Sequence, residues 1–315
     1  MIVAMLLALY AALGVVALPR LLSQVAWFER APRLAIAMWQ AACASVVVSA
    51  LLAALAVAVP ASVLGHGLAD FFEACATLLS HGVPFTSASA RIALLLAGVL
   101  VVRITYCAAC VLLSARRERR RHAEMLAIVG RHDSRLGAMV VDYDECMAYC
   151  LPGRHGLPVI TTGALRTLTS AQTAAVLAHE HAHLRGRHHL VLAAVRTLVR
   201  AFSGAPLFAR ASSEIARLVE LLADDVAARG HPRVHIAAAL VGLATGRVPD
   251  FALGAGGETA LVRVRRLLDP VEPLRQRERL VGILTIGVLL AGPAAVAAMP
   301  GVRAFLAHYC ESFIF

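Results

Sequence analysis

The stretch His179-Glu180-His181-Ala182-His183 is the most informative part of the chain, because it has the pattern H-E-x-x-H. Residues four apart on an α-helix share one face, so the imidazoles of His179 and His183 can bind the same metal ion. Glu180 is placed to act as a general base on a water at that ion. His181 is turned about 200° from His179 and should face away from the ion. The pattern therefore predicts a zinc site that hydrolyses peptide bonds.

The helix that carries this pattern has clear signals at both ends. Thr169 and Gln172 form a capping box, in which each side chain satisfies a free backbone N–H group of the first turn. Alanine-rich sequence follows and favours helix up to Gly186. His188 and His189 come after this glycine. We expect both of them, like the middle histidine of the motif, to be surface residues or part of another site and not ligands.

A second helix is predicted over 214–229 from the spacing of its apolar residues, after a serine pair that would cap it. Glu220 and Asp224 lie on one stripe of this helix, one turn apart. Glu220 is the natural third metal ligand, and Asp224 can hold a ligating histidine through its second ring nitrogen. Ion pairs with Arg217, Arg229 or solvent are the alternative, and they would be preferred for an isolated acidic pair. Beside the H-E-x-x-H pattern, metal ligation is the better explanation.

Three short strands are predicted before the histidine-bearing helix. Residues 139–142, 148–151 and 159–162 are rich in residues that favour strands, and 152–156 has the composition of a turn. An edge strand of such a sheet can bind an extended substrate by backbone pairing. The alternative is that the strands only cover the core. Both interpretations stay open.

The composition indicates a membrane protein. The chain has 315 residues, 59% of them hydrophobic, and a mean hydropathy of +0.73, which is too apolar for one soluble domain. Four apolar segments are long enough to cross a bilayer: 2–18, 34–59, 92–115 and 280–299. The first could be a signal peptide. No basic residue precedes it and Arg20 follows it, so we expect a retained anchor.

The net charge of +10 first suggests a nucleic-acid partner, with the arginine-rich run 116–121 as its contact. This run begins where the third apolar segment ends, a position typical of a cytoplasmic juxtamembrane cluster that attracts anionic lipid. We therefore expect the lipid bilayer as a partner and no direct nucleic-acid contact. Most arginines lie in 116–279, so the positive-inside rule places this part in the cytoplasm and both termini outside the cell membrane.

Two further expectations concern residues in or near the apolar segments. Cys107 and Cys110 have the spacing of a redox or zinc motif, but inside the third segment buried apolar thiols are the better explanation. Cys75 and Cys310 are the cysteines expected outside, where they can form a disulfide or remain free thiols. Arg103 lies near the middle of the third segment and should face a protein acceptor in a cleft near the predicted site. An acidic partner is expected, with backbone carbonyls as the fallback.

The motifs together resemble those of a known family. The similarity comprises Thr-Thr-Gly-Ala-Leu at 161–165, Leu-Thr at 168–169, the motif-bearing stretch 175–189 and the acidic stretch 220–224. These resemble the BlaR/MecR-type membrane metallopeptidases and, more distantly, the HtpX-type membrane proteases. The resemblance covers the layout of four spans and most of 116–279. The family's antibiotic-sensing members carry an extracellular penicillin-binding domain after the fourth span. Only residues 300–315 follow it here, so direct β-lactam sensing is not expected.

The resemblance implies a gluzincin-like zinc site made by His179, His183 and Glu220, with Glu220 and Asp224 matching the family's acidic-helix motif. The predicted fold is a mainly α integral membrane protein with four transmembrane helices. A cytoplasmic gluzincin-like α+β zinc-peptidase domain lies between the third and the fourth helix. The predicted parts are three transmembrane helices in 1–115, the peptidase domain in 116–279, and the fourth helix with a short outer tail in 280–315.

The expected function is that of a membrane-embedded zinc endopeptidase with Glu180 as its general base. The resemblance implies a cytosolic protein substrate, such as a transcriptional repressor in a signalling pathway, and self-cleavage within the large loop. A quality-control protease for membrane proteins and a non-catalytic, zinc-stabilised signalling scaffold are the alternatives, and the presence of Glu180 argues against the scaffold. Homo-oligomerisation stays open. So does the residue that stabilises the oxyanion, for which Tyr149, His155 and His231 are candidates.

Overall fold

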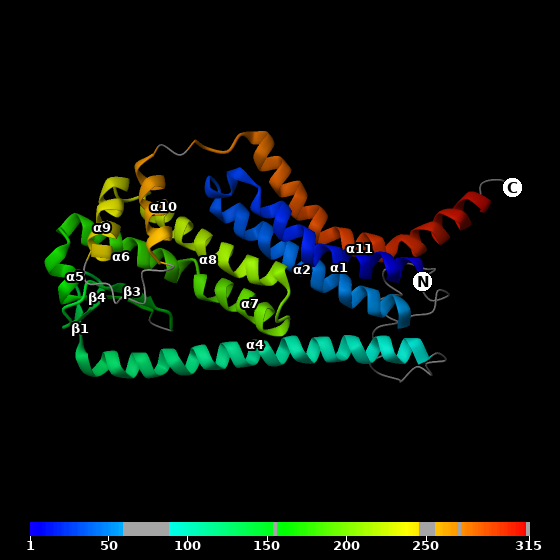
Figure 1. Ribbon diagram of the computed structural model, residues 1–315, viewed down its shortest axis with the longest axis horizontal. Coiled ribbons are helices and arrows are strands. Elements are labelled where there is room, and N and C mark those ends of the chain that lie inside the picture. The colour runs from blue at the N-terminus through cyan, green and yellow to red at the C-terminus, as the bar shows by residue number, and fades with distance from the viewer. Residues whose placement is uncertain (59–87, 154–155, 246–255, 270–271, 313–315) are drawn as a thin grey trace.

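The computed structural model describes residues 1–58, 88–153, 156–245, 256–269 and 272–312 (Figure 1). These residues form a mostly helical protein with one small sheet. The helices are α1 (Ile2–Ser23), the 3₁₀ helix η1 (Ala26–Glu29), α2 (Pro32–Ala58), α4 (Ala88–Val129), α5 (Thr162–Thr167), α6 (Ser170–Arg185), α7 (His188–Ala201), α8 (Pro206–Ala227), α9 (Arg233–Thr245), α10 (Gly256–Leu268) and α11 (Gln276–Ser312). The strands are β1 (Gly130–Asp133), β2 (Ala138–Val141), β3 (Ala148–Leu151) and β4 (Leu157–Thr161).

Four helices are long and apolar enough to cross a membrane, judged by length and composition: α1, α2, α4 and the 276–299 part of α11. They contain three of the four segments predicted from the sequence, and α2 covers the remaining one up to Ala58, after which the chain is not described. Two of them extend further than expected. Helix α4 has 42 residues and continues without a break through the arginine-rich run, and α11 continues to Ser312, where a short tail was predicted. Which side of a membrane each end faces stays a prediction.

The sheet has the strand order β1-β2-β4-β3, with β2 and β4 parallel and the other pairs antiparallel. The three predicted strands are confirmed within two residues at each end. Strand β1 was not predicted, because its sequence, Gly-Arg-His-Asp, contains no β-branched or aromatic residue. Strand β3 lies at the edge of the sheet and contacts α6. An edge strand therefore runs beside the helix that carries the H-E-x-x-H motif.

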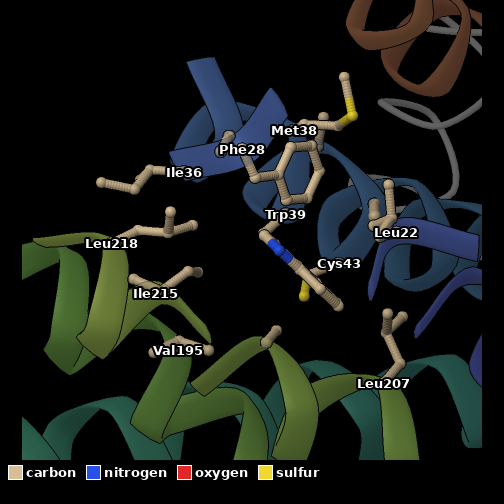
Figure 2. Close-up of a cluster of buried hydrophobic side chains, with 14 of the residues drawn as sticks. Leu22, Phe28, Ile36, Met38, Trp39, Cys43, Val195, Leu207, Ile215 and Leu218 are labelled. Atoms are coloured by element: carbon tan, nitrogen blue, oxygen red, sulfur yellow. The ribbon is translucent and has the colours of Figure 1, made fainter. Parts of the chain in front are cut away.

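The main hydrophobic core joins the apolar helices to the motif-bearing half of the chain. Helix α7 packs against α4, and α8 packs against α1 and α2 (Figure 1). Helix α2 also packs directly against α4. Figure 2 shows Trp39 and Cys43 of α2 in one cluster with Val195 of α7 and with Leu207 and Ile215 of α8. The predicted domain boundaries separate segments that share this core. The boundaries themselves stay a prediction, but the two parts pack as one body.

Helix α8 begins at Pro206, eight residues before the predicted start, so the interpretation of the serine pair as a cap was wrong. Proline is favoured in the first turn of a helix, since its missing N–H has no helical partner there. Ser213 lies inside the helix and its hydroxyl donates to the Arg210 carbonyl at 2.9 Å. The added turns bury Ala211 one turn and Leu207 two turns before Ile215, which extends the apolar face against α2.

Arg103 has a protein acceptor, but this acceptor is a backbone carbonyl and not the acidic side chain that was expected first. Its Nε donates to the Ala201 carbonyl at the end of α7 at 2.6 Å. Within the described residues it has no acidic partner, and its side chain is exposed instead of lining an interior cleft. The carbonyl is available because the last carbonyl groups of a helix have no helical partner. Arg103 therefore joins α4 to the end of α7.

The connection between α1 and α2 links the apolar bundle to the rest of the protein. Glu29 accepts a bond from Arg217 of α8 at 2.6 Å, and its backbone carbonyl accepts one from Arg266 of α10 at 2.9 Å. Arg30 forms a two-pronged ion pair with Glu278 at the start of α11, with both nitrogen–oxygen distances 3.0 Å. These contacts place α8 and α10 relative to the membrane-type helices.

The predicted pair Cys75 and Cys310 lies outside what the structure describes, because residue 75 and the side chain at 310 are not placed. The disulfide stays a prediction. Cys107 and Cys110 are free thiols, the first buried and the second half-buried, in agreement with apolar packing inside α4.

Candidate metal centre

The fold brings His179, His183 and Glu220 together. The Nε2 atoms of the two histidines are 3.1 Å apart. The Glu220 carboxylate lies 3.4 Å from His179 Nε2 and 3.5 Å from His183 Nε2. Both histidines come from α6, one turn apart, and the glutamate comes from α8, which packs against α6. In the described part of the chain this is the one group of three histidine, cysteine or acidic side chains arranged to hold a metal ion.

The separations between these atoms fit a zinc ion. Zinc binds nitrogen and carboxylate oxygen at about 2.0–2.2 Å in tetrahedral sites, so two of its ligand atoms lie about 3.3–3.5 Å apart. The three observed separations, from 3.1 to 3.5 Å, are close to this range. Two imidazoles and one carboxylate are also a donor set found in catalytic zinc sites, which keep a fourth position open. The residues present therefore fit the predicted metal.

Asp224 lies directly behind the first histidine. Its Oδ1 is 2.9 Å from His179 Nδ1, although the contact lies outside hydrogen-bond geometry. Asp224 is fully buried on α8 and is held by Arg263 of α10 through two contacts of 2.8 Å each. The remaining nitrogen of Arg263 lies 3.0 Å from Glu220. One guanidinium therefore holds both carboxylates of the acidic helix, and a small rotation of His179 would complete a hydrogen bond to Asp224.

The charges around this group suit a divalent cation. With the histidines neutral, the carboxylates of Glu180, Glu220 and Asp224 and the guanidinium of Arg263 leave two uncompensated negative charges. Burial raises the pKa of Glu180 above its usual range. Burial also disfavours the anions of Glu220 and Asp224, but contacts with His179 and Arg263 outweigh it and lower the pKa of both carboxyl groups. The site is thus set to attract a cation in a largely buried place.

The two histidines differ in their basicity. Burial tends to lower the pKa of His179, but its contacts with Asp224 and Glu220 outweigh this and raise the value to about 9. For His183 burial dominates and lowers the pKa to about 4. Near neutral pH and without a metal, His179 therefore carries a proton and His183 presents a free lone pair. A metal must displace one proton to bind both.

Comparison with known proteins agrees with this geometry. Residues 112–229 match peptidase family M48. The match runs from the second half of α4 through the sheet and α6 to the end of α8, and it includes the three converging side chains. M48 is a family of metal-dependent peptidases, so this region is similar to membrane-associated metalloproteases. Searches among curated proteins and among solved structures found no match.

One histidine inside the M48-matching region was wrongly interpreted from the sequence. His188, expected at the surface or in another site, is buried, and its Nδ1 lies 3.0 Å from Nδ1 of His183. The contact fixes the second ring nitrogen of His183 while its Nε2 faces Glu220. Gly186 makes the room for this arrangement, because a Cβ atom there would lie 2.3 Å from His188 Nε2. The residue after a helix end is hard to place by spacing, since the turn redirects the chain.

Replacing Gly186 by alanine is expected to weaken zinc binding about 10- to 100-fold, the usual effect of disturbing a partner of a ligating histidine. The backbone φ of −73° suits any residue, so the effect comes from displacing the His188 ring and not from strain. Competition with a chromophoric chelator measures the affinity. Gly230→Ala is the matched control, since a Cβ atom there meets open space. Equal affinity of both variants for zinc would contradict this role of His188.

The other candidates named from the M48-like sequence lie elsewhere. His181 contacts the Leu177 carbonyl at 2.7 Å, on the face of α6 away from Glu220, as predicted. Tyr149 reaches His122 of α4 at 2.7 Å, and His231 lines a separate cleft beside Arg229. His155 is outside the described residues. Among the described residues, the further charged side chain that contacts Asp224 and Glu220 is Arg263.

Arg263 lies outside the M48 match and was missed from the sequence. It is 84 positions from His179. A weak signal was present: Arg263 and Arg266 are three residues apart on one amphipathic helix, and they pair in order with the consecutive Asp224 and Asp225 of α8. Without a structure, nothing ties that helix to the acidic one.

The edge strand β3 reaches the general-base candidate. The Cys150 thiol of β3 contacts the Glu180 carboxylate, and burial followed by the charge of Glu180 raises the thiol pKa to about 12. The thiol is therefore protonated and can donate to Glu180. The strand passes beside the H-E-x-x-H motif, and among the described residues no strand other than β4 pairs with it.

Proposed function

We propose that the chain is a membrane-embedded zinc endopeptidase whose ion is held by His179, His183 and Glu220. The single observation that carries this proposal is the convergence of these three side chains at separations that suit zinc. The match of the same region to a metallopeptidase family supports it.

Glu180 is assigned the role of moving the proton. A bound zinc ion supplies a Lewis acid for the scissile carbonyl and lowers the pKa of its water towards 7. Glu180 lies beside the first ligand in a buried place that raises its pKa, which brings the carboxyl group closer to the proton affinity needed near neutral pH. It takes the proton of the attacking water and returns it to the leaving amine. The Cys150 thiol limits its movement by donating to it.

Asp224 and Arg263 are assigned positioning roles. Asp224 holds His179 from behind, so that the other ring nitrogen faces the ion. Arg263 holds Asp224 and Glu220, and its NH2 group lies 3.4 Å from His179 Nε2. A guanidinium has five N–H donors, and the contacts with the two carboxylates engage only some of them. The others lie beside the converging ligands, where negative charge develops on the carbonyl oxygen during attack.

The substrate is proposed to bind as an extended segment along β3. Among the described residues the outer edge of this strand pairs with no other strand, and the strand contacts both α6 and Glu180. Backbone pairing with an edge strand gives affinity without demanding one side-chain sequence. The shared core of α2, α7 and α8 holds the centre close to the apolar bundle. That position favours substrates at the membrane or anchored to it.

The finer assignment follows from the sequence motifs. We infer that the substrate is a cytosolic or membrane protein. The BlaR/MecR resemblance points to a transcriptional repressor in a signalling pathway. In this proposal the peptidase region lies in the cytoplasm and both termini lie outside. Quality-control cleavage of membrane proteins is the second candidate, and the position of the centre beside the bundle favours it. Either function requires the same chemistry.

Proteolysis by the purified full chain tests the proposal. The protein in mild detergent is expected to cleave an unfolded protein such as casein, to lose this activity with a zinc chelator, and to regain it with added zinc. Cleavage that persists after the zinc has been removed and measured as absent would overturn the proposal. A protein that binds zinc firmly and cleaves neither casein nor its own loop would favour the scaffold.

Zinc binding is expected to release about one proton near neutral pH. The pKa of His179 in the metal-free site is raised to about 9, so below that pH zinc competes with a proton, whereas His183, with a pKa of about 4, is already neutral. The apparent affinity should therefore rise about tenfold per pH unit between about pH 5 and 7. Calorimetry in buffers of different ionisation enthalpy measures the protons released. Affinity that does not change over this range would contradict the expected state of His179.

A further inference from the structure

A basic cleft lies where α4 leaves its apolar part. It has a volume of about 960 Å³ and is bordered by α4, the end of α6, the start of α7 and the turn after β3. Five arginines line it: Arg116, Arg119 and Arg120 of α4, Arg185 at the end of α6, and Arg187 in the turn between α6 and α7. The cleft is separate from the metal centre, since none of the three converging side chains lines it.

The positive charge of this cleft is uncompensated. Within the described residues, none of its five arginines pairs with a carboxylate, whereas the arginines around α8 and α10 do. His189 also lines the cleft, and its buried Nδ1 has no hydrogen-bond partner. Burial and the neighbouring charges of Arg119 and Arg187 lower the pKa of this histidine. Like charges gathered around a hollow without counter-charges indicate a site for an anion.

The arginine run of α4 is divided between two faces. Arg116, Arg119 and Arg120 have the spacing of one helix face and line the cleft. Arg117 and Arg121 belong to the same run but do not line it. A run that only gave the helix a general positive charge would not require three of its arginines to lie beside one more from the end of α6 and another from the turn before α7. The arrangement therefore indicates a built site.

The surroundings indicate which anion the cleft takes. Leu112 and Leu113 are exposed on the α4 turn just before the first arginine, and the exposed Leu190 of α7 lines the cleft itself. Apolar surface thus meets the arginines at the level where a membrane-spanning helix reaches the headgroups. A soluble anion has no apolar part that could pack against these leucines. A phospholipid has both parts, since its chains can lie along the leucines while its phosphate reaches the guanidinium groups.

We propose that this cleft binds the phosphate headgroup of an anionic phospholipid between α4 and α6. Arginine suits this ligand because its planar fork can bind phosphate oxygens in pairs. Arg185 and Leu184 belong to α6, the helix that carries both histidines of the metal centre. A bound headgroup therefore fixes α6 against α4 and connects the lipid composition of the membrane to the position of the peptidase motif.

Lipid binding to the full chain tests this proposal without any assay of proteolysis. The protein is purified in mild detergent and depleted of lipid, and dioctanoyl phosphatidylglycerol is titrated while native mass spectrometry counts the bound copies. The double variant Arg119→Gln, Arg120→Gln removes two charges from the cleft. The double variant Arg117→Gln, Arg121→Gln removes two from the same helix outside it. Thermal unfolding of both variants verifies that they are folded.

The cleft variant is expected to bind about 25-fold more weakly, roughly fivefold for each arginine removed, and the control variant less than about threefold more weakly. Dioctanoyl phosphatidylcholine should not compete. Equal weakening in both double variants would overturn the proposal in favour of diffuse attraction. Displacement by inorganic phosphate at the same concentration as the lipid would overturn it in favour of a free-anion site. Binding of an acidic octapeptide in preference to the lipid would overturn it in favour of substrate docking.

Discussion

Replacement of Glu180 by glutamine is expected to lower kcat for peptide cleavage by about 10² to 10⁴, the range for loss of a positioned general base. Glutamine keeps the size of the side chain and can still contact Cys150, but it cannot take a proton. The two ligating histidines and Glu220 are untouched, so zinc content should stay at the level of the unaltered protein. Initial rates on a fluorogenic casein, together with zinc analysis of the same samples, measure both quantities.

The exposed Glu124 of α4 provides the control for this replacement. Glu124→Gln makes the same change from carboxylate to amide on α4, away from the metal centre. It should leave the rate within a factor of about two. If Glu180→Gln retained more than one-tenth of the rate with full zinc content, another group would have to move the proton. The role assigned to Glu180 would then be wrong.

Replacement of Glu220 by alanine is expected to have the second large effect, on the metal itself. The change removes one of three protein ligands and also leaves the Arg263 nitrogen, now 3.0 Å from Glu220, without its partner. A free guanidinium close to the histidines would then repel a cation. We expect a loss of zinc affinity well beyond the 10- to 100-fold that follows from changing an outer partner, and with it loss of cleavage.

Glu214→Gln is the matched control, because Glu214 lies on the same helix and pairs with Arg210 and Arg217 at 3.1 Å, away from the centre. It should keep its zinc through dialysis against a weak chelator, while Glu220→Ala loses it. Mass spectrometry of the metal after dialysis gives the zinc content per chain. Retention of a full zinc equivalent by Glu220→Ala would remove Glu220 from the ligand set.

Local sequence signals predicted the elements of this protein well. The capping box of Thr169 and Gln172 is present, and α6 ends at Arg185 with Gly186 as its cap. The four apolar segments are helical, and the three strands with β-branched or aromatic residues are in the sheet. Each of these rests on interactions within a few residues of the chain, which a local pattern can represent. Strand β1 forms by pairing with β2 and has no such pattern.

The sequence predicted the candidate site only for residues that share one face of the same helix. Two histidines one turn apart must lie on one face, and so must Glu220 and Asp224. The contact between α6 and α8 was predicted from chemistry, because a zinc ion bound by two histidines needs a further protein ligand. Arg263, by contrast, reaches the centre through tertiary packing of α10, and its contacts satisfy buried carboxylates whose burial was not known from the sequence. His188 likewise depends on the turn at Gly186.

The shared core could not be predicted from the sequence. The apolar spacing over 214–229 predicted a helix with one buried face, and in the structure this face packs with α2, α7 and the connection that follows α1. Hydrophobic spacing shows that a face is buried, but not which partner covers it. The contacts of Glu29 and Arg30 with α8, α10 and α11 add polar links to the same junction. Movement of the apolar bundle would therefore reach the helices that carry Glu220 and Arg263.

X-ray absorption spectroscopy at the zinc edge, on the full chain in detergent, tests the central claim most directly. The account predicts one zinc per chain with two imidazole nitrogens at about 2.0–2.1 Å and carboxylate or water oxygen completing the shell. The His183→Ala variant should lose one imidazole from this signal or lose the metal. Sulfur at about 2.3 Å, as Cys150 or another thiol would give, or an unchanged spectrum in His183→Ala, would contradict the proposed site.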